Sequence, residues 1–205
     1  MNAAEKLFAE QGYHACSLRM IAVECGINQG LIHYHFANKL DLFSQVFLRR
    51  AVPLTDERIA RLAEARARAK GGRIPIDALI RAYIEPIVRR LQEGPAWQAY
   101  LKIHLGLRQN WEFGLELRRQ AFGESTRLFL NELERTCTHL SKSAVFLRFN
   151  FMVGIYLSVI AELGRVSDHS AGMRVPRDPE TLLPQMVAFL VAGFDAAEPK
   201  AARRG

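Results

Sequence analysis

A short segment beginning at Gln29 carries side chains that suit contact with nucleic acid. The amide of Gln29 can pair with adenine through two hydrogen bonds, which adds about 1–3 kcal/mol of discrimination against other bases. Gly30, His33 and Tyr34 follow within the next five residues and occupy the early, exposed positions of the segment. Imidazole and hydroxyl groups, together with a lysine ammonium, can hold phosphates. This set of residues predicts a short helix that reads DNA.

The elements that must position this segment are short helices, each with an identifiable start. We expect helices over residues 3–11, 18–25 and 29–36, followed by a longer helix from residue 39. Ser17 and Asn28 are suitable N-caps for the second and third helices, and Asn38 with Asp41 predicts a capping arrangement for the fourth. The second and third helices, joined by a turn at Gly26, form a helix-turn-helix over residues 17–36. The second helix of such a motif enters the DNA major groove.

The apolar residues of the first 50 positions predict one small core. Its expected members are Leu7, Phe8, Ile21, Ala22, Ile27, Leu31 or Ile32, Phe36, Leu42 and Phe43.

Composition restricts the class of protein without identifying it. The chain has 205 residues, a formal net charge of +7 and 49% hydrophobic residues, which favours an ordinary globular chain with a possible polyanionic partner. The first 51 residues carry five basic and four acidic side chains, so DNA recognition must depend on placed residues rather than on bulk charge. Strand patterns are nearly absent, and we expect an all-α fold.

Three further features concern the compartment. The cysteines Cys16, Cys25 and Cys137 form no CxxC pair, and we expect buried or half-buried thiols in a reducing cytoplasm. The start of the chain shows no charged-then-apolar leader. The apolar stretch 149–161 is shorter than the roughly 20 residues that span a bilayer. We therefore expect a cytoplasmic protein that is not bound to a membrane.

The first 50 residues resemble the DNA-binding domain of TetR-type (TetR/AcrR family) transcriptional regulators. The resemblance rests on Ala4, Leu7-Phe8-Ala9-Glu10, Gly12-Tyr13, Ser17, Ile21-Ala22, Gly26-Ile27-Asn28, Gly30, Ile32, His35-Phe36, Lys39 and Leu42. It implies an all-helical protein with a helix-turn-helix domain over residues 1–50. It also implies a larger helical domain for ligand binding and dimerisation over residues 51–205.

The resemblance also implies which residues contact DNA. Arg19, Gln29 and Gly30 would lie at or near base edges, and Ser17, His33, Tyr34, His35 and Lys39 would hold phosphates. With the cap Asn28, the candidate DNA-binding residues are Ser17, Arg19, Asn28, Gln29, Gly30, His33, Tyr34, His35 and Lys39.

Three features depart from the family pattern. Cys16 stands where the family usually has Thr, and His33 stands where Tyr is usual. A histidine can still donate to a phosphate, with a contribution that depends on pH near neutrality. The chain also begins close to the first helix without a basic lead-in, which leaves a longer native start as an alternative.

The late part of the chain resembles the family more loosely. Segments 149–154 and 186–194 are similar to the last two helices of members related to fatty-acid-responsive and multidrug-type repressors. Each of these helices carries two adjacent apolar stripes, whereas a helix that faces only its own core needs one. We expect the second stripe to form a homodimer interface, although burial in one larger core is the alternative. The candidate interface residues are Phe149, Val153, Tyr156, Ile160, Met186 and Leu190.

Aromatic residues concentrate between residues 97 and 156 and suggest a pocket for a small apolar or aromatic effector, with a fatty-acid-like molecule as one candidate. The candidate pocket residues are Trp97, Tyr100, His104, Trp111, Phe129, Phe149 and Tyr156. Plain core packing is the alternative for each of them. Arg148 stands in an apolar run, and a salt bridge with Glu162 or Glu134 is its simplest interpretation. Pro53 should kink or interrupt its helix. The following basic residues are expected on a solvated helix face: Arg58, Arg61, Arg66, Arg68, Lys70 and Arg73.

These observations predict a dimeric, ligand-responsive DNA-binding transcriptional regulator, most simply a repressor that a small effector releases from its operator. The alternative is a ligand-independent architectural DNA-binding protein. The sequence contains no Gly-rich phosphate loop, nucleophile elbow or HExxH motif, so we expect no enzyme and no catalytic residues. His33 and His35 point apart on a helix, so we expect no metal and no other cofactor.

Overall fold

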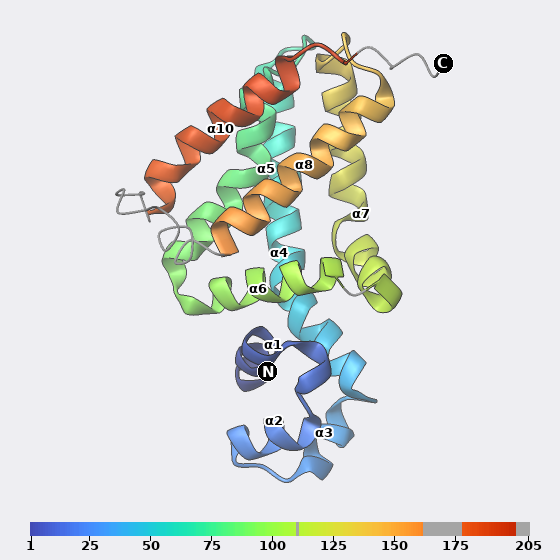
Figure 1. Cartoon of the computed structure of the whole chain (residues 1–205), viewed down its shortest axis with the longest axis vertical. Coiled ribbons are helices and arrows are strands. Elements are labelled where there is room, and N and C mark those ends of the chain that lie inside the picture. Colours follow the sequence, from blue (N-terminus) through green and yellow to red (C-terminus); the bar gives the residue numbers. More distant parts are fainter. Residues whose placement is uncertain (110, 162–177, 200–205) are drawn as a thin grey trace. The chain divides into compact units, whose positions relative to one another are not determined.

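A computed structural model describes residues 1–109, 111–161 and 178–199 (Figure 1). Within these residues the chain forms helices and no strand, which confirms the predicted all-α fold. The helices are α1 (Asn2–Ala15), α2 (Leu18–Cys25), α3 (Gln29–His35), α4 (Lys39–Arg68), α5 (Ile76–Arg90), the short 3-10 helix η1 (Leu91–Glu93), α6 (Pro95–Gln109), α7 (Trp111–Thr136), α8 (Lys142–Ala161) and α10 (Pro179–Asp195).

The helices form two compact units that are each assembled from separate parts of the chain. The first unit comprises Met1–Asp56 and Arg89–Gly123, so it holds α1 to α3, the start of α4, α6 and the start of α7. The second unit comprises Glu57–Val88 and Glu124–Gly205. The helix-turn-helix thus shares its unit with segments that lie far along the sequence. A domain boundary at residue 50 stays a prediction.

The helix starts in the first unit follow the predicted capping residues. The Ser17 hydroxyl accepts a hydrogen bond from the Met20 amide at 3.2 Å, and Asn28 Oδ1 accepts one from the Gly30 amide at 2.7 Å. Asn38 Oδ1 accepts from the Asp41 amide at 2.9 Å. Each cap satisfies an N–H group that has no partner inside its helix, so local sequence fixes where these helices begin.

The turn between α2 and α3 depends on Gly26. Its backbone adopts the left-handed conformation, with φ 66° and ψ 30°, which glycine reaches at little cost. The Ile27 amide donates to the Ala22 carbonyl and the Gly26 amide donates to the Val23 carbonyl, both at 3.0 Å. These two bonds close a Schellman motif that ends α2 and directs the chain into α3.

Helix α1 is longer than the predicted 3–11, because it continues to Ala15 across a break at Gly12, where φ is 78° and ψ is 170°. The end of α1 is held by Lys39 at the start of α4. The Lys39 ammonium donates to the carbonyls of Tyr13 at 2.9 Å, His14 at 3.5 Å and Cys16 at 3.0 Å. It also lies 4.3 Å from the centroid of the Tyr13 ring. One side chain therefore joins two helices of the helix-turn-helix domain.

The predicted small core is present with two changes, at Ile27 and at Phe36, which is only half-buried. Leu7, Phe8, Ile21, Ala22, Ile32, Leu42 and Phe43 are buried. Ile27 is exposed, because it lies in the turn that follows Gly26 and not on an inward helix face. Of the two alternatives at the start of α3, Ile32 enters the core and Leu31 does not.

A charged cluster that the sequence did not indicate connects α1 to α4. The Glu5 carboxylate is 2% exposed and accepts hydrogen bonds from Arg49 Nη2 at 2.8 Å and Arg50 Nε at 3.0 Å. Because a buried carboxylate without partners is costly, these two arginines compensate for the burial of Glu5. Side-chain hydrogen bonding to Glu5 also raises the pKa of the Arg50 guanidinium.

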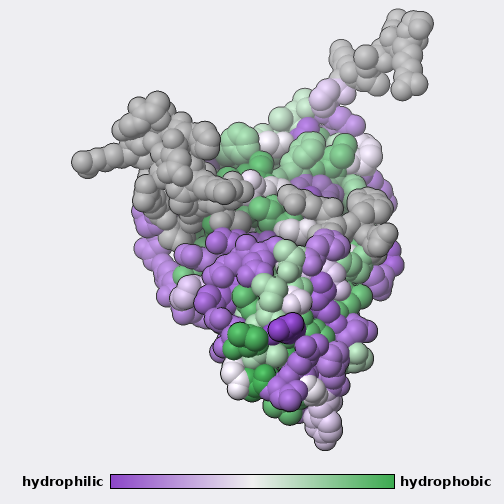
Figure 2. Space-filling model, turned by 60° about the horizontal axis from the view of Figure 1, so that its bottom comes forward, coloured by the Kyte–Doolittle hydropathy of each residue, from purple (hydrophilic) through white to green (hydrophobic). Residues whose placement is uncertain are grey.

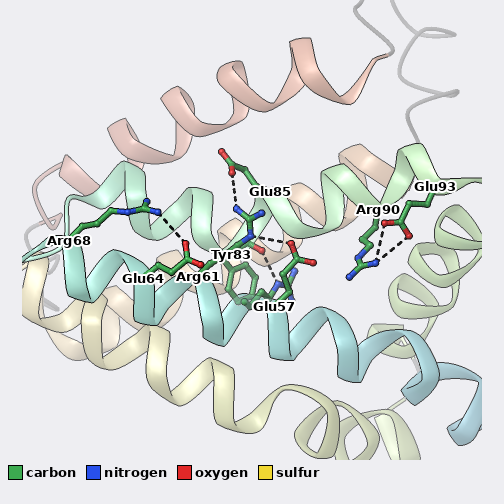
Figure 3. Close-up of polar contacts among 9 residues, drawn as sticks. Glu57, Arg61, Glu64, Arg68, Tyr83, Glu85, Arg90 and Glu93 are labelled. Atoms are coloured by element: carbon green, nitrogen blue, oxygen red, sulfur yellow. Dashed lines mark hydrogen bonds and ion pairs between the residues drawn. The ribbon is translucent and has the colours of Figure 1, made fainter.

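Arg58 corrects the expectation of a solvated arginine face on α4. Its side chain is fully buried in the second unit. Nε donates to the Tyr83 carbonyl at 2.8 Å, Nη2 donates to the Tyr156 hydroxyl at 3.2 Å, and the guanidinium lies 3.9 Å from the centroid of the Tyr83 ring. The other arginines of this helix form ion pairs instead. Arg61 bonds both Glu57 and Glu85, and Arg68 bonds Glu64 (Figure 3).

Two long helices differ from their predicted form. Helix α4 continues through Pro53 to Arg68, so the proline does not end it. Within α8, the segment Lys142–Ile160 is long and apolar enough to cross a membrane by length and composition alone, although the shorter stretch 149–161 suggested otherwise. A core helix passes the same test, and α8 packs on α10 with 39% of this segment buried.

Within the described residues, Arg148 does not form the salt bridge predicted with Glu134. Its Nη1 donates to the carbonyls of Gly193 at 2.8 Å, Phe194 at 3.0 Å and Ala196 at 2.6 Å, and Nη2 donates to the carbonyl of Ala197 at 3.2 Å. Glu134 pairs with Lys142 instead, and Glu162 lies outside the described residues. Arg148 therefore caps the C-terminus of α10, where carbonyls lack partners and a cation is favourable.

The cysteines follow the predicted pattern only in part. Cys16 and Cys137 are buried, whereas Cys25 is exposed. Burial raises the pKa of the Cys16 thiol, which keeps it in its neutral form. At the position where the family usually has a hydroxyl, this chain thus has a residue that packs as a small hydrophobe.

Candidate DNA-binding site

Helix α3 presents an exposed strip on the side opposite a single buried anchor, and all of its residues except Ile32 are exposed. Ile32 is 4% exposed and fixes one face of the helix against the core, while Tyr34 on the opposite side is 83% exposed. Gly30 lies one turn before Tyr34 and is also exposed. Because Gly30 has no side chain, the backbone of α3 can approach a base pair closely at this point. This geometry suits insertion into a major groove.

Gln29 and His33 form a pair on one flank of the strip. Gln29 Nε2 lies 3.3 Å from His33 Nε2, at hydrogen-bond distance, and both side chains are exposed. A hydrogen bond between residues one turn apart limits the rotamers that the glutamine samples. The hydrogen bond therefore restricts the conformations of the Gln29 amide in the free chain, and its pairing with adenine stays a prediction.

The other flank contains an exposed apolar residue that is not among the DNA contacts predicted from the sequence. Leu31 is 47% exposed, and Val23 on α2 is 76% exposed. In Figure 2, which turns the end with α2 and α3 toward the reader, hydrophobic patches lie among hydrophilic side chains. Apolar side chains in a recognition helix can contact the methyl group of thymine. The sequence holds one sign of this contact: Leu31 and Ile32 are adjacent on a helix, so only one of them can face the core and the other must be exposed.

The remaining candidate DNA contacts fall into two groups. Arg19, Asn28 and His35 are exposed, whereas Ser17 and Lys39 are half-buried. Ser17 and Asn28 use their side-chain oxygens as caps, and Lys39 directs its ammonium at three carbonyls of the α1 end. The free chain therefore uses these three side chains to hold the reading helices. Their contacts with phosphate stay predictions.

The candidate dimer residues lie inside the chain. Phe149, Val153, Tyr156, Ile160, Met186 and Leu190 are all buried within it. The large apolar side chains that α8 and α10 expose are Phe146, Leu147, Phe151 and Phe189. Both apolar stripes predicted on α8 thus face largely inward, because this helix packs against α4, α5 and α10. The homodimer stays a prediction, with its contact surface moved to the exposed residues.

The candidate ligand-pocket residues separate into two clusters, one in each unit. In the first unit, Trp97, Tyr100 and His104 pack with Phe47 and Phe122, and the stacked rings of His104 and Phe122 are 4.8 Å apart. In the second unit, Phe129, Phe149 and Tyr156 surround the Tyr83 ring. The side chain of Trp111 lies outside the described residues. Two cavities beside α1 are lined by residues other than these candidates. The predicted ligand pocket therefore stays a prediction.

Comparison with known proteins places the two parts of the chain in one family. Residues 1–46 match the family described as "Bacterial regulatory proteins, tetR family", and residues 81–193 match "Tetracyclin repressor-like, C-terminal domain". The HTH-type transcriptional repressor BepR of Brucella suis biovar 1 (strain 1330) is 39% identical over 51 residues. This match covers 25% of the chain and 24% of BepR. The chain aligns with about a quarter of the length of the curated relatives that it matches.

Solved structures share the fold over almost the whole chain. The fatty acid degradation regulator FadR from Bacillus halodurans has a TM-score of 0.64 at 18% identity, covering 94% of this chain and 92% of FadR. FadR from Bacillus subtilis in complex with stearoyl-CoA has a TM-score of 0.55 at 22% identity, covering 94% of this chain and 96% of that one. With the family matches at both ends, these likenesses lead to one conclusion: the chain belongs to the TetR family of bacterial regulatory proteins.

Proposed function

We propose that this chain is a ligand-responsive transcriptional repressor that binds operator DNA through α3. The observation that carries the proposal is the exposed strip of Gln29, Gly30 and Tyr34 above the buried anchor Ile32. The amide of Gln29 selects an adenine, and exposed His33 and His35 contact phosphates. A regulator of chromosomal genes acts in the cytoplasm, where we place this protein.

The exposed apolar residues of α8 and α10 support a homodimer as the binding form. Phe146, Leu147, Phe151 and Phe189 are each more than half exposed, which is costly for large apolar side chains that gather on two packed helices. Helix-turn-helix dimers bind two half-sites roughly 34–36 Å apart, so the distance between two copies of α3 decides whether both engage DNA.

Helix α4 is suited to connect effector binding to this distance. It begins with Lys39 in the helix-turn-helix and runs without interruption to Arg68 in the second unit. A ligand that binds one conformer of the second unit better than another shifts the equilibrium between conformers that hold α3 differently. The free-energy shift cannot exceed the difference between the ligand's binding free energies for the two conformers. The complex of Bacillus subtilis FadR with stearoyl-CoA supports an effector with a long apolar chain.

Mobility-shift titration on the DNA upstream of its own coding sequence tests this proposal. We expect a specific, salt-sensitive complex, because phosphate contacts release counterions. Adding stearoyl-CoA should dissociate the complex and raise the melting temperature of the free protein. The absence of any specific complex would contradict DNA binding by this chain, and a tighter complex with stearoyl-CoA would contradict release.

A ligand-independent architectural DNA-binding protein is the second candidate. Such a protein would bind many DNA sequences with similar affinity, and neither acyl-CoA nor aromatic compounds would change its melting temperature. A competition experiment with unrelated duplex DNA distinguishes the two candidates.

A further inference from the structure

A cavity in the first unit lies beside the break in α1. It has a volume of about 290 Å³, and α1, α6 and the start of α7 line it, together with Phe43 of α4. Its walls include the rings of Phe8, Tyr13, Phe43 and Phe113, which contact one another with centroids 4.6–6.3 Å apart. A single aromatic ring fits this volume, since an apolar cavity of about 150 Å³ binds benzene.

The position of Gly106 on α6 keeps the cavity open. A Cβ atom placed at Gly106 would meet no neighbouring atom within 4 Å, so a larger residue here would project into empty space. The exposed residues Gln11, His14 and Lys102 form the rim and leave a path for entry. The cavity is thus both accessible and shaped by an absent side chain.

The charge of the lining selects the class of ligand. Among the lining residues no carboxylate is present, and the titratable groups are Tyr13, His14 and Lys102. The Lys102 ammonium has no hydrogen-bond or ion-pair partner in the described part of the chain. Burial raises the pKa of Tyr13, which keeps its hydroxyl available as a donor. An apolar floor with a cationic rim complements an aromatic ring that carries a negative charge.

We propose that this cavity is a second small-molecule site, separate from the proposed effector site, and that it takes a monocyclic aromatic carboxylate. The ring packs against Phe43 and Phe113, and the carboxylate pairs with the ammonium of Lys102. The site adjoins Gly12 and Tyr13, whose segment Lys39 holds. A bound ligand therefore stabilises the end of α1 within the unit that carries the reading helices. The proposal does not depend on DNA binding.

Titration of the full chain with benzoate tests the site, with calorimetry and the amide NMR signals of Gly12 and Gly106 as readouts. We expect saturable binding that shifts both signals, and weaker binding of the neutral isostere benzamide. Lys102→Gln should weaken benzoate about two- to fivefold, because the ammonium is exposed and the ion pair is partly screened. Lys142→Gln, which alters a lysine of the second unit, serves as the matched control.

Gly106→Leu supplies the second variant, because its side chain fills the cavity. It should remove benzoate binding without lowering the melting temperature, since leucine also favours helix more than glycine does. Benzoate that leaves both glycine signals unshifted would overturn the proposal. Equal benzoate affinities for wild type, Lys102→Gln and Gly106→Leu would do so too. Mobility shifts without benzoate report separately on the proposed DNA-binding function.

Discussion

The helix-turn-helix and the pair α8 and α10 use their side chains in opposite ways. In the helix-turn-helix, the residues proposed to function are exposed, and a cap or a turn within a few residues holds each of them. In α8 and α10, the residues that the sequence predicts for contacts between subunits are buried inside the chain, and other apolar residues of the same helices are exposed. Short-range rules thus place the first set, whereas the second depends on how several helices pack.

The largest expected effect comes from Phe149, which separates core packing from dimer contact. Phe149→Ala should lower the free energy of unfolding by about 3–5 kcal/mol, because it leaves a cavity among Tyr83 and its neighbours. Phe151→Ala on the same helix, at 60% exposed, should weaken self-association instead. Denaturant unfolding and analytical ultracentrifugation measure the two quantities. The contrast fails if Phe149→Ala affects only association.

A smaller effect is expected at Lys39, which tests whether the reading head relies on its own internal contacts. Lys39→Ala should reduce the free energy of unfolding by about 1–3 kcal/mol, because three carbonyls at the end of α1 lose a charged donor. Lys6→Ala removes an exposed ion pair with Glu24 and is the matched control. Equal stability of the two variants in denaturant unfolding would mean that Lys39 is free to act on phosphate alone.

In the second unit, Arg148 provides the corresponding test of helix capping. Arg148→Ala should cost about 1–2 kcal/mol of stability, because the carbonyls at the end of α10 lose a cationic partner. Arg119→Ala breaks only an exposed i,i+3 pair with Glu116 and should change stability by less than about 0.5 kcal/mol. Hydrogen exchange at the end of α10 locates the change, and unaltered protection there would contradict the capping role.

The smallest expected effect is at Ser17, where a single local bond is removed. Ser17→Ala should destabilise the chain by about 1 kcal/mol, because the Met20 amide loses its cap. Ser17→Thr keeps the hydroxyl and should restore most of the stability. Thermal unfolding checks both variants, and a Ser17→Ala protein as stable as wild type would show that the cap contributes nothing.

Much of the first unit could be predicted from the sequence because its rules are local. The caps Ser17, Asn28 and Asn38 were identifiable from residue type and position, and the structure has all three bonds. The apolar side chain of Ile27 predicts a core position, but the turn after Gly26 leaves this residue exposed. The burial of Glu5 was not predictable, since its partners lie more than 40 residues away on α4.

The contacts of the later helices could not be predicted, because periodicity alone does not show which apolar face of a helix packs against other helices. Helix α8 has apolar residues on most of its circumference, so Phe146 and Phe149 look equivalent in the sequence although only Phe149 is buried. The burial of Arg58 could not be predicted for a related reason. It belongs to a run of charged residues, and only the distant Tyr83 and Tyr156 make its burial tolerable.

The most direct test of the exposed strip on α3 is the affinity of wild type and Gln29→Ala for the upstream DNA across a salt series. We expect wild type to form a specific complex whose affinity falls as salt rises. Gln29→Ala should lose about 1–3 kcal/mol of discrimination at one base position, with an unchanged salt slope and unchanged protein stability. Equal affinity and equal sequence preference of the two proteins would contradict the role assigned to α3.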